Sequence, residues 1–440
     1  MRAEQRNGKA YSGNDSRTLH SIDLLKDNGL HSFIAQNNWI TSYGASILRN
    51  KILAETKIVS FLDFKEYKVF QSAEIQTMIY VIKKEPSSEE YFVNYLGIRN
   101  LNMPTSQLIE ILNNSKADKE NSVSLKIRFN SKAYTNKTID FITVDLNKIL
   151  SKIENASNYH LKKEEVAQGI VAPQETAIES HLSRLHNPGI KSGDGIFVLS
   201  KSELANFKIT EEESNVIKPF YTTNELFKYY GNPENHFVII YTKSDANKNI
   251  SSFPAIKNHL DKFKDIMTSD FAPYGLHRSR KQEFFEGENI VSLRKTSEPA
   301  FTYVDFPCYV SQTFFILKPK GIDMKLLTGI LNSKVIHFWL RNKGKKQGGL
   351  LQIDKAPLLD LPIVLPKDGN DELSNSIINA VGAIINFTKN VNSSKSESDK
   401  GVYRNKIKFE TDRLDTLIFK LYELDKDDVS EINKFLKDNN

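Results

Sequence analysis

The stretch "LHSFIAQNNWITSYGASILRNKILAETKIVSFLD", residues 30–63, decides the fold class of the first part of the chain. It begins with the short apolar run "LHSFIA" and ends with "KIVSFLD", and both runs predict strands. Between them, apolar side chains recur at helical spacing at Ile47, Leu48, Ile52 and Leu53. A strand, a helix and a second strand in this order predict an α/β fold.

The flanking segments extend the same pattern. Leu19, Ile22 and Leu25 lie on one helical stripe before Asn28-Gly29, and "IQTMIYVIKK" (75–84) predicts a third strand. The predicted order is therefore helix, strand, helix, strand, strand. Three strands are too few for a doubly wound sheet that is covered on both faces, so this region is expected to be half of such a domain.

The remaining chain divides by composition. The charged, proline-containing segment "KKEPSSEE" marks a first boundary, and further strands and a helix follow it. The strand-like segments include 123–129 and 140–146, and one helix is expected at 323–341. The sequence predicts an α/β half-domain at residues 1–85 and a connecting α/β segment at 86–165. A mixed α+β domain is predicted at 166–366, and a small helical cap at 367–440. The low-complexity stretch 390–401 is expected to be a solvated loop.

Composition limits the class of protein. The chain has 440 residues and 60 basic against 54 acidic side chains, a net charge of +6 that permits a polyanionic partner without requiring one. Its single cysteine, Cys308, excludes an internal disulfide and any multi-cysteine metal site, which predicts a reducing compartment. The polar N-terminus lacks a signal sequence, and the apolar run at 377–387 is too short to span a bilayer. We expect a cytoplasmic protein with no membrane partner.

The segment "YGLHRSRKQEFFEGENIVSLRK" (274–295) is the first of two basic clusters and is a candidate for contact with nucleic acid. Arginine can donate to both major-groove acceptors of guanine, a contact that discriminates by about 1–3 kcal/mol. The candidates for base edges or nearby phosphates are His277, Arg278, Arg280, Lys281 and Arg294, and Gln312 is a weaker candidate for an adenine edge. The alternatives are that one of the arginines pairs with Glu283, Glu286 or Glu288, and that Gln312 is an ordinary surface residue.

The second basic cluster is "WLRNKGKKQGG" (339–349). It holds four cations and no acid, and three glycines would let main-chain amides approach an anion. We predict that it binds backbone phosphate through Arg341, Lys343, Lys345 and Lys346. The alternative is a solvated helix end, where cations are favourable in any case.

Signatures of enzyme chemistry are mostly missing from the sequence. It contains no glycine-rich nucleotide loop between a strand and a helix, no H-E-x-x-H motif and no cysteine and histidine pair at a diagnostic spacing. The sequence therefore predicts neither a cofactor-binding nor a metal-binding residue in this chain.

Longer motifs resemble a known family. The segments "FIAQNNWITSYGASILRNKI" and "IVSFLDFKEYKVFQSAEIQTMIYVIKK" resemble the later half of the catalytic domain of gamma-class amino-methylating DNA methyltransferases. The segments "QGIVAPQE", "FYTTNEL", "PYGLHRSRKQEFFEGENIVSLRK", "LTGILNSKVIHFWLRNKGKKQGG" and "QIDKAPLLDLPI" resemble the TaqI-like C-terminal specificity domain of type IIG restriction-modification enzymes. Together these resemblances cover nearly the whole chain.

The resemblance implies a function. Such enzymes flip an adenine out of the duplex and methylate it from S-adenosylmethionine, while the specificity domain holds the double-stranded DNA. Residues 1–85 would be the C-terminal part of a Rossmann-like methyltransferase domain, and residues 166–366 the target-recognition domain. The motif "KVFQSAEIQT" aligns Phe70 with the aromatic residue that stacks on the flipped base. The alternative is that Phe70 is a core residue beside the strand.

The sequence departs from the family at its start. The cofactor motif and the N-P-P-Y motif of the family precede the point that matches Met1, and neither occurs in the chain. We therefore expect a truncated product, a split-gene subunit or a fragment that recognises DNA but does not methylate alone, so that S-adenosylmethionine belongs only to the complete enzyme. The main alternative is an active enzyme completed in trans by a separate N-terminal half that docks near residues 30–35. A third is a protein-interaction remnant that uses its helical tail.

Overall fold

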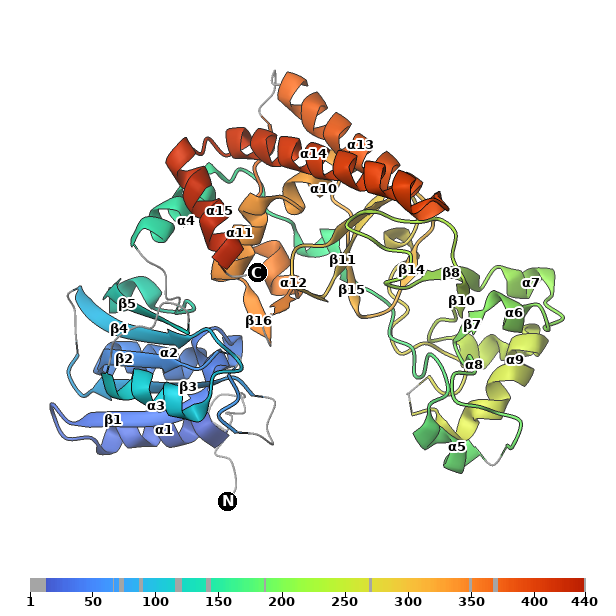
Figure 1. Cartoon of the computed structure of the whole chain (residues 1–440). Helices are drawn as coiled ribbons and strands as arrows, with labels where there is room; N and C mark the ends of the chain where they lie inside the picture. The colour runs from blue at the N-terminus through green and yellow to red at the C-terminus, as the bar shows by residue number, and fades with distance from the viewer. Residues whose placement is uncertain are drawn as a thin grey trace. The chain divides into compact units, whose positions relative to one another are not determined.

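The computed structural model describes residues 13–65, 67–70, 75–86, 90–114, 121–139, 144–185, 187–268, 271–347, 350–366 and 371–438. They form two compact units (Figure 1). Unit 1 lies within residues 1–152 and 339–352, and unit 2 lies within residues 153–338 and 353–440. Each unit is described by itself.

Unit 1 is built on a five-stranded mixed sheet in the order β1-β3-β2-β4-β5. Strand β3 runs antiparallel to both β1 and β2, β2 runs parallel to β4, and β4 runs antiparallel to β5. The strands are β1 (Leu30–Gln36), β2 (Lys57–Asp63), β3 (Thr77–Lys83), β4 (Tyr91–Ile98) and β5 (Ser122–Phe129). The sheet thus includes strands on both sides of the boundary that the sequence placed at residue 86.

Helices pack on both faces of this sheet. Those of unit 1 are α1 (Gly13–Leu24), α2 (Ser46–Glu55) and α3 (Thr105–Asn114). One core joins α1 and α2 to the sheet through Ile22, Ile52 and Tyr80, whereas α3 packs through Leu108 and Ile111 in a smaller core on the opposite face. The predicted order of helix, strand, helix, strand, strand is confirmed over residues 13–83.

Unit 2 contains two mixed sheets. The first is four-stranded, in the order β14-β8-β10-β7, and the second is five-stranded, in the order β6-β15-β11-β13-β9. The strands of the first are β7 (Val198–Ser200), β8 (Ile217–Tyr221), β10 (Phe237–Ile240) and β14 (Tyr309–Val310). Those of the second are β6 (Val166–Gln168), β9 (Tyr229–Tyr230), β11 (Asn289–Leu293), β13 (Phe301–Val304) and β15 (Phe314–Leu317).

One apolar core joins both sheets of unit 2. It includes Leu199 and Ile239 from the first sheet, Val291 and Ile316 from the second, and Phe285 from the loop before β11, all nearly inaccessible to solvent. Because the two sheets share this core, the side chains presented by their connecting segments keep a fixed relation to one another. The predicted mixed α+β architecture of this region is confirmed.

The remaining helices follow mostly in the second half of the chain. They are α4 (Val144–Ala156), α5 (Glu179–Leu185), α6 (Lys201–Leu204), α7 (Glu211–Ser214), α8 (Ala246–Asn249), α9 (Pro254–Leu260), α10 (Met324–Leu331), α11 (Lys334–Lys343), α12 (Lys355–Leu359), α13 (Asp371–Ser393), α14 (Glu397–Leu421) and α15 (Lys426–Asp438). The last three form the predicted helical tail, in which α13 and α14 run side by side (Figure 1). No helix in the described ranges combines the length and the apolar character needed to cross a membrane.

Three local predictions are wrong. The single helix expected at 323–341 is two helices, because Asn332 ends α10 and its side-chain amide pairs with the main chain of Phe301 through bonds of 2.9 and 2.7 Å. The predicted loop at 390–401 is largely helical, belonging to the end of α13 and the start of α14. Of the strand expected at 140–146, the last three residues begin α4 and the first four lie outside the described residues.

Candidate nucleic-acid interface

The strap formed by residues 163–171 organises the site, and it crosses between the two sheets of unit 2. Its strand β6 pairs antiparallel with β15, and beyond β6 the strap forms isolated bridges at Ile170 and Val171. The Val171 N–H donates to the Arg278 carbonyl at 3.0 Å, and the Arg278 N–H donates back at 3.1 Å. The strap therefore holds the basic segment 277–281 in place through main-chain bonds.

Gly169 permits the close approach of the strap to its neighbour. A Cβ atom at this position would lie 2.6 Å from the carbonyl oxygen of Val310 and would overlap the carbonyl of Ser311. The Gly169 N–H also donates to the Phe314 carbonyl at 2.9 Å. A side chain would therefore push the strap away from the β14–β15 connection.

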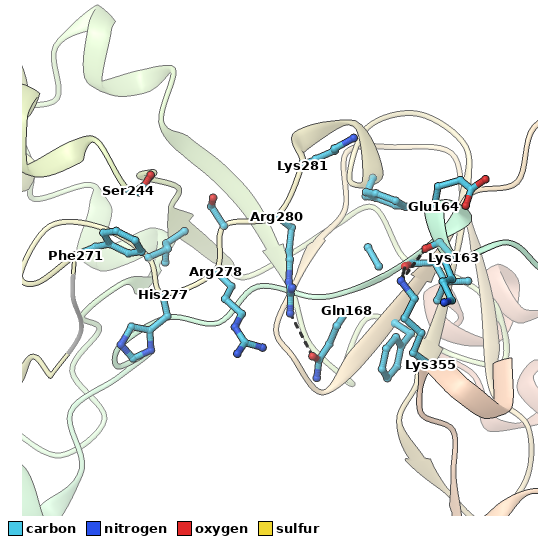
Figure 2. Close-up of a pocket in the computed structure, with 16 residues that line it drawn as sticks. Lys163, Glu164, Gln168, Ser244, Phe271, His277, Arg278, Arg280, Lys281 and Lys355 are labelled. Atoms are coloured by element: carbon cyan, nitrogen blue, oxygen red, sulfur yellow. Dashed lines mark hydrogen bonds between the residues drawn. The ribbon is translucent and has the colours of Figure 1, made fainter. Parts of the chain in front are cut away.

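A cleft of about 730 Å³ lies along this strap (Figure 2). Two stretches of chain supply most of its wall, residues 163–164 and 166–168 from the strap and residues 276–281 from the basic segment. Ser244, Phe271, Phe284, Phe315 and Lys355 complete the lining. All of these residues belong to unit 2.

The cleft is strongly cationic. Five basic side chains and a histidine line it, and the lining includes one carboxylate, that of Glu164; the cationic set is Lys163, His277, Arg278, Arg280, Lys281 and Lys355. Lys281 forms a solvent-exposed ion pair with Glu283 at 3.5 Å. Within the described part of the chain, the other lysines and arginines of the cleft have no carboxylate in ion-pair contact. An uncompensated cluster of this kind favours a polyanionic ligand.

Arg280 is held by protein groups. Its backbone adopts a φ of 65°, and the Tyr241 hydroxyl donates to its carbonyl at 3.0 Å. Its guanidinium donates from Nε to the Gly169 carbonyl and from Nη2 to the Gln168 Oε1, both at 3.2 Å (Figure 2). Burial lowers the pKa of Arg280, and the neighbouring charge of Arg278 lowers it further.

Lys355, the first residue of α12, is anchored in the same way. Its Nζ donates to the carbonyl oxygens of Lys163 and Val166, each at 2.7 Å. Burial lowers the pKa of Lys355, and the positive charges of Arg280 and Lys163 act in the same direction, whereas the carboxylate of Glu164 acts in the opposite direction. The strap thus fixes two cations at neighbouring positions of the cleft.

Arg278 differs from Arg280 although the two are separated by a single residue. Its backbone is fixed by Val171, but its side chain is exposed and has no hydrogen-bond or ion-pair partner among the described residues. Figure 2 shows its guanidinium between His277 and Arg280. Arg278 is therefore the arginine of the cleft whose whole donor fork is available to a ligand.

The other candidates of the first basic cluster lie elsewhere. Arg294 pairs with Asp354 at 2.6 Å and does not line the cleft. Gln312 is exposed and outside the lining, and its carbonyl accepts a 3.0 Å bond from Gln168 Nε2.

The carboxylates near this cluster have their own partners. Glu286 accepts from the Tyr309 hydroxyl at 2.6 Å and Glu288 from the Tyr303 hydroxyl at 2.7 Å, while Glu283 pairs with Lys281. The expected pairing of an arginine with one of these three glutamates is therefore wrong.

The second basic cluster belongs to the part of the chain grouped with unit 1. Arg341 is largely buried and Lys343 ends α11, whereas Lys345 and Lys346 are exposed on β16 (Lys345–Gln347). That strand pairs with β17 (Leu350–Gln352), so part of the expected glycine-loosened loop is a hairpin strand. Gly348 and Gly349 lie outside the described residues.

Phe70 lies in unit 1, shortly after β2. Its side chain is 46% exposed, so the alternative that it is a buried core residue does not hold. The rest of its motif, residues 71–74, lies outside the described residues.

Three residues of the cleft were missed from the sequence: Lys163, Gln168 and Lys355. Lys355 and Gln168 lie inside motifs used for the family resemblance, but nothing in the local pattern distinguishes them from surface residues. Their role becomes visible only because the strap brings positions far apart in sequence to one wall.

Two family models match the chain. Residues 218–363 match the TaqI-like C-terminal specificity domain, and residues 18–70 match the Eco57I restriction-modification methylase. The chain resembles a restriction-modification methylase with a TaqI-like specificity domain. The TaqI-like segment contains every lining residue of the cleft except those contributed by the strap.

The chain is similar to solved structures, of which MmeI shares its fold. The type IIL restriction-modification enzyme MmeI, determined in complex with DNA, matches over 96% of this chain and 51% of its own length, with 14% identity and a TM-score of 0.59. The type IIG restriction endonuclease BpuSI matches over 93% of this chain and 49% of its own, with 15% identity and a TM-score of 0.33. The chain thus spans about half the length of these two enzymes.

Proposed function

We propose that unit 2 binds double-stranded DNA in its cationic cleft and serves as the sequence-recognising part of an adenine-specific DNA methyltransferase of a restriction-modification system. The observation that carries this proposal is the cleft itself, where six basic or imidazole side chains converge within and beside the TaqI-like segment. Neutralising phosphates with such cations releases condensed counterions and supplies sequence-independent affinity. The structure of the similar enzyme MmeI was determined in complex with DNA, which supports the proposal that unit 2 binds DNA.

Sequence selection in this proposal depends on Arg278. Its backbone is fixed and its guanidinium has no partner among the residues that the structure describes, so it can present two parallel donors to the acceptors of one guanine. His277 lies next to it in the cleft and could bond a neighbouring base edge or phosphate. Arg280 and Arg294 already donate to protein acceptors, and they are weaker candidates for base readout.

Unit 1 would be the C-terminal part of a Rossmann-like methyltransferase domain, with Phe70 stacking on the flipped base. The exposure of Phe70 is compatible with this role. The segments that follow β1 and β2 contain no glycine-rich loop of the kind that lets main-chain amides approach a nucleotide-like cofactor. We therefore assign no residue of this chain to S-adenosylmethionine, which would be held by other parts of a complete enzyme.

A second candidate function is that of a subunit completed in trans by a separate methyltransferase half. The observation that favours it is β1, an edge strand of the described sheet with two exposed apolar side chains, Leu30 at 64% and Ile34 at 38%. Exposed apolar edge strands are typical sites for pairing with another chain. Methyl transfer that requires both polypeptides would support this candidate.

Selection from a pool of randomised duplexes by the full chain tests the proposed DNA recognition. We expect wild-type protein to enrich a defined sequence, and Arg278→Ala to relax the preference at one position by about 1–3 kcal/mol while other positions stay selected. Arg17→Ala, which removes an exposed arginine from α1, is the matched control and should leave the preference unchanged. Failure of the wild-type chain to retain any duplex at low salt would refute the proposal.

A further inference from the structure

We propose that Lys355, Arg280 and Lys163 form a subsite for a backbone phosphate, separate in its role from the base-reading Arg278. This inference rests on the proposed DNA-binding function and divides the cations of the cleft between two tasks. One group supplies affinity for any sequence, and the other supplies discrimination.

The first argument is that the strap holds two of these cations, Lys355 and Arg280, in place before any ligand binds. Lys355 donates to two strap carbonyls, those of Lys163 and Val166, and Arg280 donates to the Gly169 carbonyl and the Gln168 side chain. An ammonium has three donors and a guanidinium five, so each group keeps donors for a ligand. Because their positions are already fixed, little side-chain freedom is lost on binding.

The second argument is electrostatic. Three cations lie close enough that the positive neighbours of Lys355 oppose its charge, and no carboxylate of the described residues forms an ion pair with any of them. The carboxylate of Glu164 acts on Lys355 in the opposite direction without forming an ion pair among the described residues, so the repulsion between the like charges is only partly compensated. An anion bound among them would offset this repulsion, and a DNA phosphate is the anion that the proposed function supplies.

The third argument distinguishes phosphate from base. The edge of Arg280 that carries Nε and Nη2 is occupied by protein acceptors, which removes one of the parallel donor pairs used for bidentate base readout. The ammonium groups of Lys163 and Lys355 act as point charges, which suits phosphate oxygens in many orientations. Figure 2 shows Lys163 and Lys355 together at one side of the cleft and His277 at the other, with the two arginines between them.

Gln168 has a positioning role in this subsite. Its Oε1 accepts from Arg280 Nη2 at 3.2 Å and its Nε2 donates to the Gln312 carbonyl at 3.0 Å. The amide therefore ties the guanidinium of Arg280 to the β14–β15 connection. Gln168 would not itself need to contact the DNA.

The experiment is the salt dependence of binding of the full chain to a duplex of mixed sequence. Losing the contact with one phosphate should reduce the slope of log affinity against log salt by about 0.9. Because the three cations share one phosphate, we expect Lys355→Gln, Arg280→Gln and Lys163→Gln each to flatten the slope, and the triple variant to flatten it by about 0.9 in total. Glutamine keeps an amide donor for the strap carbonyls at positions 280 and 355. Lys320→Gln, which removes an exposed lysine of unit 2 outside the cleft lining, is the matched control and should keep the wild-type slope.

The outcomes separate this inference from the proposed function. Wild-type binding to duplex with unchanged slopes in Lys163→Gln and Lys355→Gln would overturn the phosphate subsite and leave the DNA-binding proposal standing. Absence of wild-type binding would overturn the DNA-binding proposal itself. If the position 280 or 355 variants do not fold, Lys163→Gln decides alone, because that side chain is exposed. Variants that flatten the slope but also change the selected sequence would contradict the division of tasks.

Discussion

At the scale of single residues, His259 should make the stability of unit 2 depend on pH. It is buried between Phe207 and Phe263, and its Nε2 lies 2.9 Å from the Ile196 carbonyl. Burial lowers the pKa of His259 below its ordinary value of 6.5, and the charge of Lys262 adds to this, while the Ile196 carbonyl and Glu203 act in the opposite direction. The fold therefore favours the neutral imidazole.

The sign of the effect follows from proton linkage. The unfolded chain binds the proton of His259 more tightly than the folded one. The stability that the neutral imidazole contributes is therefore complete above about pH 6.5, and it is lost as the pH falls through the lower pKa of the folded state. We expect the urea midpoint of unfolding to decrease between about pH 7.5 and pH 5.5. His259→Gln can keep a donor for Ile196 and should flatten this dependence. Parallel pH profiles of variant and wild type would contradict the assignment.

The cleft shows why residue type alone did not decide function. Arg278, Arg280 and Arg294 have the same chemistry and lie in one predicted segment. Among the described residues, however, the side chain of Arg278 has no partner, that of Arg280 donates to the strap and that of Arg294 pairs with Asp354. The sequence identified the basic segment because charge density is local. It could not assign the three environments, because their partners come from positions 60 to 112 residues away along the chain.

At the scale of elements, Glu213 links two short helices of unit 2. Its carboxylate accepts from the Thr210 N–H at 3.0 Å, within the capping box of α7, and from the Ala255 and Ile256 N–H groups of α9 at 2.7 and 3.0 Å. Burial would raise the pKa of Glu213, but these hydrogen bonds outweigh it and lower the pKa. A carboxylate so placed satisfies donors that a helix start leaves open.

Replacing Glu213 with Gln should therefore destabilise the protein. The amide has one acceptor oxygen in place of two and no negative charge, so we expect a loss of about 1–3 kcal/mol in the free energy of unfolding, measured by urea denaturation. Glu212→Gln removes the same charge from the same turn at an exposed position and serves as the control, with an expected change within about 0.5 kcal/mol. Equal effects of the two substitutions would show that the link between the helices contributes nothing.

The elements themselves were predicted with uneven success for a physical reason. Strands β1, β2, β3 and β5 were placed correctly because apolar runs bounded by polar residues are visible in a short window. The start of α14 was missed because Glu397 and its neighbours are polar and low in complexity. That helix is stabilised by its N-cap Ser396 and by packing against α13, and the packing is not a local property.

At the scale of the whole molecule, two compact units with separate cores predict that unfolding is not a single cooperative step. Trp39 is buried in the core of unit 1, with its ring centroid 5.0 Å from that of Tyr80. In a Trp339→Phe variant it would be the only tryptophan, and its fluorescence would report that core alone. The far-UV circular dichroism signal would be dominated by the long helices of unit 2.

We expect the two signals of this variant to change at different urea concentrations, because cooperative unfolding is expected within one core and not across two. As a control for the substitution itself, the circular dichroism transition of the Trp339→Phe variant is compared with that of the wild type. Coincident fluorescence and circular dichroism transitions would contradict the prediction.

The α/β pattern of the first part, the mixed α+β region after it, the helical tail and the basic segment 274–295 can all be predicted from the sequence. These features depend on periodicity, composition and motif, which are properties of neighbouring residues. Which cations share a cleft is visible only in the folded chain. Gly169 lets the strap approach the β14–β15 connection, and this contact brings Lys163, Arg280 and Lys355 to one wall. No local pattern specifies such an arrangement, because it depends on main-chain bonds between distant segments.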